Sequence, residues 1–212
     1  MSFEADPVVL GVGEVLWDLL PGGKRLGGAP ANVACHASQL GANAFLASCV
    51  GSDELGVEIR EHLARFGLDR FPLQVTEDYP TGTVDVRLDE AGMPQYDIHK
   101  DAAWDHLSCN EALENLAAQA DAVCFGSLAQ RSEETRLTIH KVLRKTPFEC
   151  LRVFDVNLRQ SFFDDDVIRR SLAFANVLKL NEDELPVVAG ALNINTHGDP
   201  VDALGEIQTK AN

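Results

Sequence analysis

Short apolar runs alternate with helix-like segments along most of this 212-residue chain, and this alternation constrains the fold more than any other feature. The apolar runs are PVVLGVG, AFLASCV, AVCFGSL, LRVFDVN and VLKLN. Helical patterns lie at residues 31–40, 53–66, 111–120, 133–145, 166–175 and 182–192. Strands that alternate with helices form a mostly parallel sheet with helices on both faces. We therefore predict a doubly wound α/β fold.

Local signals predict where two of the helices begin and end. Pro30 lies near the start of the helix at 31–40, and Gly41 comes just after its end. For the next helix the sequence predicts Ser52 as the N-cap, acidic residues in the first turn and Gly67 as the stop.

Residues 83–99 change from the helical to the strand period. Apolar and polar residues alternate in TVDVRL, DEAG supplies a turn, and alternation resumes in QYDI. This pattern predicts a half-buried β-hairpin that stands apart from the α/β body. We predict one domain, residues 1–212, with the hairpin as a lid inserted at about residues 80–105.

Composition narrows the functional classes. The formal net charge of −15 disfavours nucleic acid and anionic membrane surfaces as partners. No apolar run approaches the ~20 residues needed to span a bilayer, and MSFEADP lacks the basic and apolar parts of a signal peptide. The five cysteines never form a CxxC pair, which favours reduced thiols in a cytoplasmic protein. The six histidines show no metal-ligand spacing, so no zinc site is predicted.

Three common motifs are absent or incomplete. GVGEVL, at residues 11–16, has the first two glycines of a dinucleotide-binding motif but lacks the third, and WDLLPGG after it does not open a helix. The chain contains neither GxxxxGK[ST] nor GxSxG. These observations argue against a nicotinamide-dependent oxidoreductase, a P-loop protein and a serine hydrolase.

Polar residues concentrate where the predicted strands end. They are Glu14, Asp18, Gln130, Arg131, Asp155, Asn157, Arg159, Asn181 and Glu184. Because ligands of open parallel sheets bind at the carboxyl ends of the strands, we expect a binding site there. Each residue also has a structural explanation. Asn181 and Glu184 match a helix-capping box, Asp18 could mark a strand end, and Arg159 could pair with the acidic residues at 164–166.

The stretch LGGAPANVACHASQLGA, residues 26–42, places two glycines before a helix of small residues. Glycine removes the Cβ that would block a ligand from approaching the backbone. Small side chains let a helix pack closely on a sheet. The stretch is therefore consistent with both a ligand-contacting turn and close packing.

The stretch GGAPANVACHASQLGANAFLASCVGSDELG resembles the N-terminal signature of the PfkB, or ribokinase-like, carbohydrate kinases. GEVLWDLLP, AAWDHL, FGSLAQR, FDVNLRQSFF and VLKLNEDEL resemble the fructokinase branch of that family. The resemblance covers nearly the whole chain, and the combination of the glycine-rich block with D-x-N-x-R and N-x-x-E is specific. It implies a ribokinase-like fold with a lid, which in many relatives pairs with the lid of a second subunit in a homodimer.

The resemblance also implies roles for individual residues on the sugar side. The residues it places against the sugar are Asp18, Gly27, Gly28, Asn32, Gln130, Arg131, Asn157 and Arg159. Aspartate and asparagine offer acceptors and donors to the hydroxyls of a polyol. Asn157 and Arg159 match positions on the route from sugar to phosphate, where Arg159 is also the candidate contact to the transferred phosphate.

The cofactors implied by the resemblance are ATP and Mg²⁺. The residues expected on the nucleotide side are Lys179, Asn181 and Glu184, with Glu184 reaching Mg²⁺ through water. Relatives continue into a C-terminal half with a G-A-G-D motif that supplies the general base, the anion hole and the adenine pocket. The 212 residues contain no GAGD, so we expect either a fragment of a longer protein or a degenerate relative.

The activity that follows from the resemblance is ATP-dependent phosphorylation of a sugar hydroxyl, with D-fructose as the expected substrate. A kinase for another substrate of the family, such as ketodeoxygluconate or a nucleoside, is one alternative. A non-catalytic remnant that binds sugar or dimerises is the other. In either case, residues 1–212 alone are expected to be inactive as a kinase.

Overall fold

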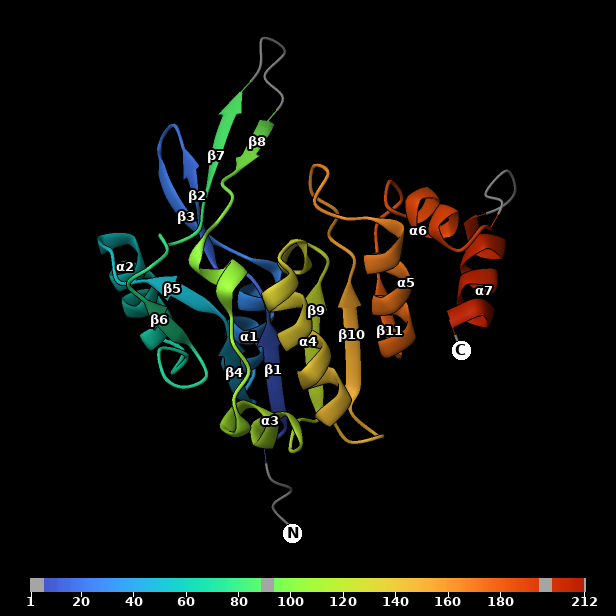
Figure 1. Cartoon of the computed structure of the whole chain (residues 1–212), viewed down its shortest axis with the longest axis horizontal. Helices are drawn as coiled ribbons and strands as arrows, with labels where there is room; N and C mark the ends of the chain where they lie inside the picture. The colour runs from blue at the N-terminus through green and yellow to red at the C-terminus, as the bar shows by residue number, and fades with distance from the viewer. Residues whose placement is uncertain (1–5, 89–93, 195–199, 212) are drawn as a thin grey trace.

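The computed structural model describes residues 6–88, 94–194 and 200–211. Its centre is a five-stranded, fully parallel sheet in the order β11-β10-β9-β1-β4 (Figure 1). The strands are β1 (Val8–Val12), β4 (Asn43–Ala47), β9 (Ala122–Gly126), β10 (Leu151–Asp155) and β11 (Val177–Lys179). The predicted doubly wound α/β fold is confirmed.

Helices cover both faces of this sheet. The helices of the described residues are α1 (Ala29–Gln39), α2 (Glu54–Ala64), α3 (Glu111–Ala117), α4 (Glu133–Lys145), α5 (Asp165–Phe174), α6 (Leu185–Ala191) and α7 (Pro200–Ala211), with short 3-10 turns η1 (Ala103–His106) and η2 (Leu128–Arg131). In Figure 1, α4 and α5 lie in front of the sheet and α1 lies behind it. In the described ranges, no helix combines the length and the apolar character that crossing a bilayer requires.

The alternation of side chains along each strand divides the core between the two faces. Phe125 and Phe154 are buried in the larger apolar cluster, where their rings stack with centroids 5.4 Å apart. Ala31, Ala34 and Leu46 belong to the cluster beneath α1. The small side chains of α1 thus allow close packing. This is one of the two explanations that the sequence analysis gave for residues 26–42.

A second sheet stands beyond the carboxyl edge of the first. Its strand order is β3-β2-β7-β8, with β2 (Leu16–Leu20), β3 (Gly23–Gly27), β7 (Thr83–Leu88) and β8 (Pro94–Ile98). Strands β7 and β8 form the antiparallel hairpin that the sequence predicted, and Figure 1 shows it extending away from the body. The predicted DEAG turn lies outside the described residues. The sequence interpretation missed β2 and β3, which add two strands to this sheet.

Two local predictions were wrong. The apolar run AFLASCV is not one strand, because it leaves the central sheet after β4 and continues as β5 (Cys49–Gly51), which pairs with β6 (Gln74–Thr76). The N-cap of α2 is Asp53 and not Ser52. The Asp53 carboxylate accepts hydrogen bonds from Gly56 N at 2.8 Å and from Thr81 N at 2.8 Å, so it also joins α2 to a distant loop.

Candidate functional site

A cleft of about 600 Å³ lies between the carboxyl edge of the central sheet and the second sheet. Seven of the residues predicted to contact substrate or cofactor line it: Asp18, Gly27, Gly28, Asn32, Asn157, Arg159 and Lys179. Apolar side chains from the hairpin, including Val84 and Ile98, form another part of its wall. The cleft therefore combines backbone without side chains, polar groups suited to hydroxyls, and three cationic side chains, since Arg25 lines it as well.

The two glycines are required by the local geometry of the cleft. A Cβ at Gly27 would lie 2.7 Å from Oδ2 of Asp18, which projects from the neighbouring strand. Gly28 is the N-cap of α1 and has φ of 106°, a conformation that other residues adopt only with strain. A Cβ at Gly28 would also lie 2.4 Å from the carbonyl oxygen of Glu14.

Gly28→Ala is expected to lower the free energy of unfolding by about 1–3 kcal/mol, because it adds backbone strain and a contact with rigid main chain. Urea unfolding followed by circular dichroism measures this change. Gly22→Ala is the matched control, since a Cβ at Gly22 meets nothing within 4 Å. A Gly28 variant as stable as the control variant would show that the backbone at position 28 tolerates a side chain.

The sequence analysis placed Glu14 among the polar residues at the expected binding edge but gave it no individual role. It follows β1, is 0% exposed, and accepts a hydrogen bond from Ala29 N through Oε1 at 3.2 Å. Because the N-cap of α1 is a glycine without a side chain, Glu14 supplies the helix with the acceptor that an N-cap residue normally provides. The sequence signal that indicates this role of Glu14 is an acidic residue combined with a helix whose N-cap is glycine.

The second carboxyl oxygen of Glu14, Oε2, is buried and has no hydrogen-bond partner among the described residues. The pKa of Glu14 is raised to about 7, chiefly by burial and to a smaller extent by the charge of Asp155, while the backbone amides and Arg159 act in the opposite direction. Glu14 is thus a carboxyl group at the cleft that changes charge near neutral pH.

The charged groups of the cleft are arranged around Asp18 and Arg159. Burial raises the pKa of Asp18, while the charges of Arg159 and Arg25 act in the opposite direction. Within the described ranges Arg159 forms no ion pair, and the acidic residues at 165 and 166 pair instead with Arg169 and Arg170. The guanidinium of Arg159 is therefore available to a ligand.

Asn157 and Lys179 complete this side of the cleft. Asn157 has a φ of 42°, in the left-handed region, and such conformations concentrate at functional sites. Nζ of Lys179 donates to Oδ1 of Asp155 at 2.8 Å, so the lysine lies against the end of β10. Its charge is partly compensated by Asp155.

Asn181 and Glu184 lie in an adjacent hollow of about 340 Å³ that Arg159 also lines. They form the capping box that was one of two explanations of N-x-x-E: Glu184 N donates to Asn181 Oδ1, and Asn181 N donates to Glu184 Oε2, both at 2.9 Å. Glu184 Oε1 accepts from Leu158 N at 3.0 Å. Both carboxylate oxygens already accept backbone hydrogen bonds, so the residues fit an indirect contact with Mg²⁺ through water better than direct coordination.

Gln130 and Arg131 were predicted to contact the ligand, but neither lines the cleft. Nε2 of Gln130 donates to Gly126 O at 2.9 Å and to Ser171 Oγ at 2.8 Å inside the core. Both residues belong to the tight turn η2, in which successive side chains point in different directions. Their position after β9 therefore did not determine which way they point.

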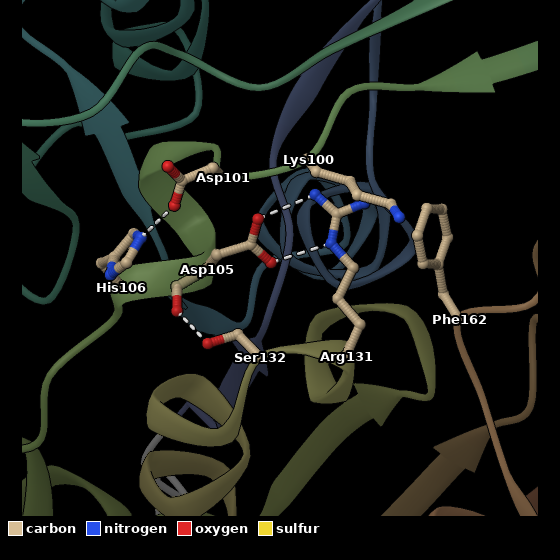
Figure 2. A pocket seen from close by; sticks show the side chains of 7 residues that line it. All are labelled: Lys100, Asp101, Asp105, His106, Arg131, Ser132 and Phe162. Carbon is tan, nitrogen blue, oxygen red and sulfur yellow. Dashed lines mark hydrogen bonds and ion pairs between the residues drawn. The ribbon is translucent and has the colours of Figure 1, made fainter.

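Arg131 instead joins the hairpin stem to the loop after β10. Its side chain is 7% exposed and donates to both carboxylate oxygens of Asp105, at 2.9 and 2.8 Å, and to His99 O at 2.6 Å. Its guanidinium carbon lies 4.0 Å from the ring centroid of Trp104 and 4.6 Å from that of Phe162. Figure 2 shows the paired hydrogen bonds to Asp105, with Lys100 and Phe162 beside the guanidinium. Arg131 is therefore a buried structural link.

Comparison with known proteins agrees with this geometry. The sequence signature of the pfkB family carbohydrate kinases matches residues 21–212. The chain belongs to the pfkB family. A sugar kinase of Pyrococcus horikoshii is 33% identical over 168 residues, which are 76% of this chain and 54% of the relative. The fructokinase of Salmonella typhimurium is 32% identical over 192 residues, which are 85% of this chain and 62% of the relative.

Solved structures of pfkB relatives have the same fold. The crystal structure of the Pyrococcus horikoshii sugar kinase in complex with ATP superposes with a TM-score of 0.75 at 29% identity, covering 90% of this chain and 68% of that one. The fructokinase of Xylella fastidiosa with bound ATP gives a TM-score of 0.80 at 21% identity, covering 95% and 65%. This pfkB chain spans about 54–63% of the length of three curated relatives, namely the two described above and the fructokinase of Klebsiella pneumoniae.

Proposed function

We propose that the protein containing this chain transfers the γ-phosphate of ATP to a hydroxyl of fructose. The observation that carries the proposal is the cleft, which the glycine turn at residues 27–28, Asp18 and Asn32 line together with Arg159. Relatives about 32–33% identical are named fructokinases, which supports fructose over the other substrates of the family. Kinases of ketodeoxygluconate or nucleosides remain the alternative within the family.

Different residues of this chain are proposed to bind the sugar and to position the phosphate. Asp18 and Asn32 accept and donate hydrogen bonds to sugar hydroxyls, and the glycine turn lets the sugar approach the backbone. Arg159 faces the transferring phosphate and stabilises its negative charge. Glu184, through its hydrogen bond from Leu158 N, holds the segment between Asn157 and Arg159 in place.

The nucleotide side is proposed to include Lys179 and Asn181, with Glu184 contacting Mg²⁺ through water. Bound Mg²⁺ would neutralise phosphate charge during transfer. The hairpin of β7 and β8 is proposed as a lid over the sugar, and as a homodimer contact in the complete protein. The general base and anion hole are assigned to a GAGD segment, which these 212 residues do not contain. By itself, this chain is proposed to bind sugar without transferring phosphate.

Asp18→Ala is expected to weaken fructose binding by roughly tenfold to a hundredfold. Hydrogen bonds to a charged group contribute about 1.5–3 kcal/mol, and every 1.4 kcal/mol corresponds to a tenfold change in affinity. Titration calorimetry of residues 1–212 with fructose measures the loss. In a longer, active form of the protein, the KM for fructose should rise while the KM for ATP changes little.

The matched control is Asp69→Ala, because Asp69 is exposed and lies outside the cleft. It should bind fructose like the unaltered chain. Equal affinities of the Asp18 and Asp69 variants would contradict the assignment of Asp18 as a sugar ligand, and would leave it with only a structural place in the middle of β2.

A further inference from the structure

The outer face of the hairpin formed by β7 and β8 carries a cluster unrelated to the cleft. Along these strands Val84 and Ile98 face the cleft, so the alternate residues point away from it. Those alternate residues include Asp85, Asp97 and His99. One carboxylate oxygen from each aspartate and one ring nitrogen of the histidine all lie within 4.8 Å of one another.

The register of the hairpin places the two carboxylates directly opposite each other. Asp85 pairs with Asp97, whereas the neighbouring pair Val84 and Ile98 is apolar. Like charges at directly opposed positions destabilise a strand pair. The only cation among the described residues that approaches Asp85, apart from His99, is Arg87, whose Nη2 lies 3.6 Å away on a side chain that is 78% exposed. Such an exposed pair contributes little.

The imidazole of His99 is oriented toward the carboxylates by a residue outside the cluster. Its Nδ1 lies 2.8 Å from Oγ1 of Thr83, and its Nε2 lies 3.2 Å from Oδ2 of Asp85. When Nδ1–H donates to a hydroxyl oxygen, the lone pair of Nε2 is left for a ligand. This is the arrangement by which a hydrogen-bond partner fixes the ring and tautomer of a metal-binding histidine.

We propose that Asp85, Asp97 and His99 bind one divalent transition-metal ion of the Zn²⁺ class on the outer face of the hairpin. One imidazole and two carboxylates match the ligands that Zn²⁺ accepts, whereas Mg²⁺ prefers oxygen ligands alone. Water completes the coordination, because Asp97 and His99 are exposed. The ion replaces carboxylate repulsion with a cross-link between the two strands. Sequence spacing predicted no zinc site, because the ligands come from two strands whose pairing is set by the fold.

A cluster held by hydrogen bonds alone is the alternative to a metal site, and added metal distinguishes the two. A metal site binds Zn²⁺ saturably through the three side chains. A cluster held only by hydrogen bonds is indifferent to Zn²⁺. The site lies on the face opposite the cleft, so the proposal is independent of the kinase activity.

The test uses purified, metal-free residues 1–212 titrated with Zn²⁺ by calorimetry and with Co²⁺ by visible absorption. We expect one equivalent of either ion to bind, and Zn²⁺ to displace Co²⁺. His99→Ala and Asp97→Asn should each weaken binding at least tenfold. Thr83→Val keeps all three ligands but should weaken binding about tenfold, as the loss of a partner to a metal-binding histidine does.

Matched controls are Asp69→Asn and His36→Ala, which replace exposed residues outside the cluster and should bind Zn²⁺ like the unaltered chain. Circular dichroism establishes that each variant is folded. If His99→Ala fails to fold, the Zn²⁺ affinities of Asp97→Asn and Thr83→Val test the proposal. Failure of the unaltered chain to bind either ion saturably would overturn the proposal. Equal binding by the cluster variants and the controls would overturn it as well.

Discussion

Purified residues 1–212 are expected to release ADP from ATP no faster with fructose than without it. Phosphoryl transfer depends on positioning and on charge stabilisation at the transferring group. A general base contributes about 10²–10⁴-fold and a single donor of an anion hole about 10²–10³-fold, and both are assigned to a GAGD segment outside these residues. Arg159 and Asp18 remain, but the roles proposed for them are to bind and position the substrates and do not include removal of the hydroxyl proton.

A coupled ADP-release assay, with and without fructose, measures this directly. An intact fructokinase, such as that of Salmonella typhimurium, serves as the positive control in the same assay. Fructose-dependent ADP release at ordinary kinase rates would mean that the catalytic base lies within the 212 residues. Glu14, whose pKa is raised to about 7, would then be the first group to replace.

Glu14→Gln is expected to remove a large part of the pH dependence of stability between pH 4.5 and 7. Burial raises the pKa of Glu14 from 4.5 to about 7, so in this range the folded chain holds a proton that the unfolded chain has released. Stability therefore falls as the pH rises, by about 3 kcal/mol when 1.36 kcal/mol is assigned to each pKa unit. The contribution is fully present below pH 4.5 and is lost above pH 7.

Glutamine has nearly the same shape as the neutral carboxyl group and keeps an acceptor for Ala29 N. The variant should be close in stability to the unaltered chain at pH 4.5, and more stable at pH 8 by about 1–3 kcal/mol. Urea unfolding at several pH values measures the difference between the two chains. Glu133→Gln, at an exposed position, is the control and should keep the original slope. If the stability of the Glu14 variant changed with pH as steeply as that of the control, Glu14 would be ionised in the folded chain over the whole range from pH 4.5 to 7.

The central sheet could be predicted because its strands are buried on both faces and therefore appear as continuous apolar runs between helices. Strands β2 and β3 could not, because β3 is mostly exposed and polar, a Pro-Gly turn at residues 21–22 joins the two strands, and β2 gains its second partner from β7. That partner is distant in sequence. No local pattern in residues 16–27 indicates that the hairpin of β7 and β8 lies beside them.

The position of the cleft was predictable for a different reason: the carboxyl ends of parallel strands must meet at one edge, so Asp18, Asn157 and Arg159 were expected to converge there. The direction in which each side chain points was not predictable. Arg131 comes at the same edge, but the turn η2 points it toward Asp105 and the ring of Trp104. The buried state of Glu14 likewise depends on the fold, since it arises only when α1 packs beside the end of β1.

The position of β1 within the sheet has a consequence for biosynthesis. Among the strands of the central sheet, β1 leaves the ribosome before the others and pairs early with β4. Its other neighbour is β9, and Val8 N donates to Oδ2 of Asp121 across 113 positions. At about 5–20 residues per second, translation leaves that edge of β1 without its partner for roughly 6–20 s. An unpaired apolar edge is a template for strands of other chains. Intermolecular pairing between nascent chains therefore competes with folding until β9 has been synthesised.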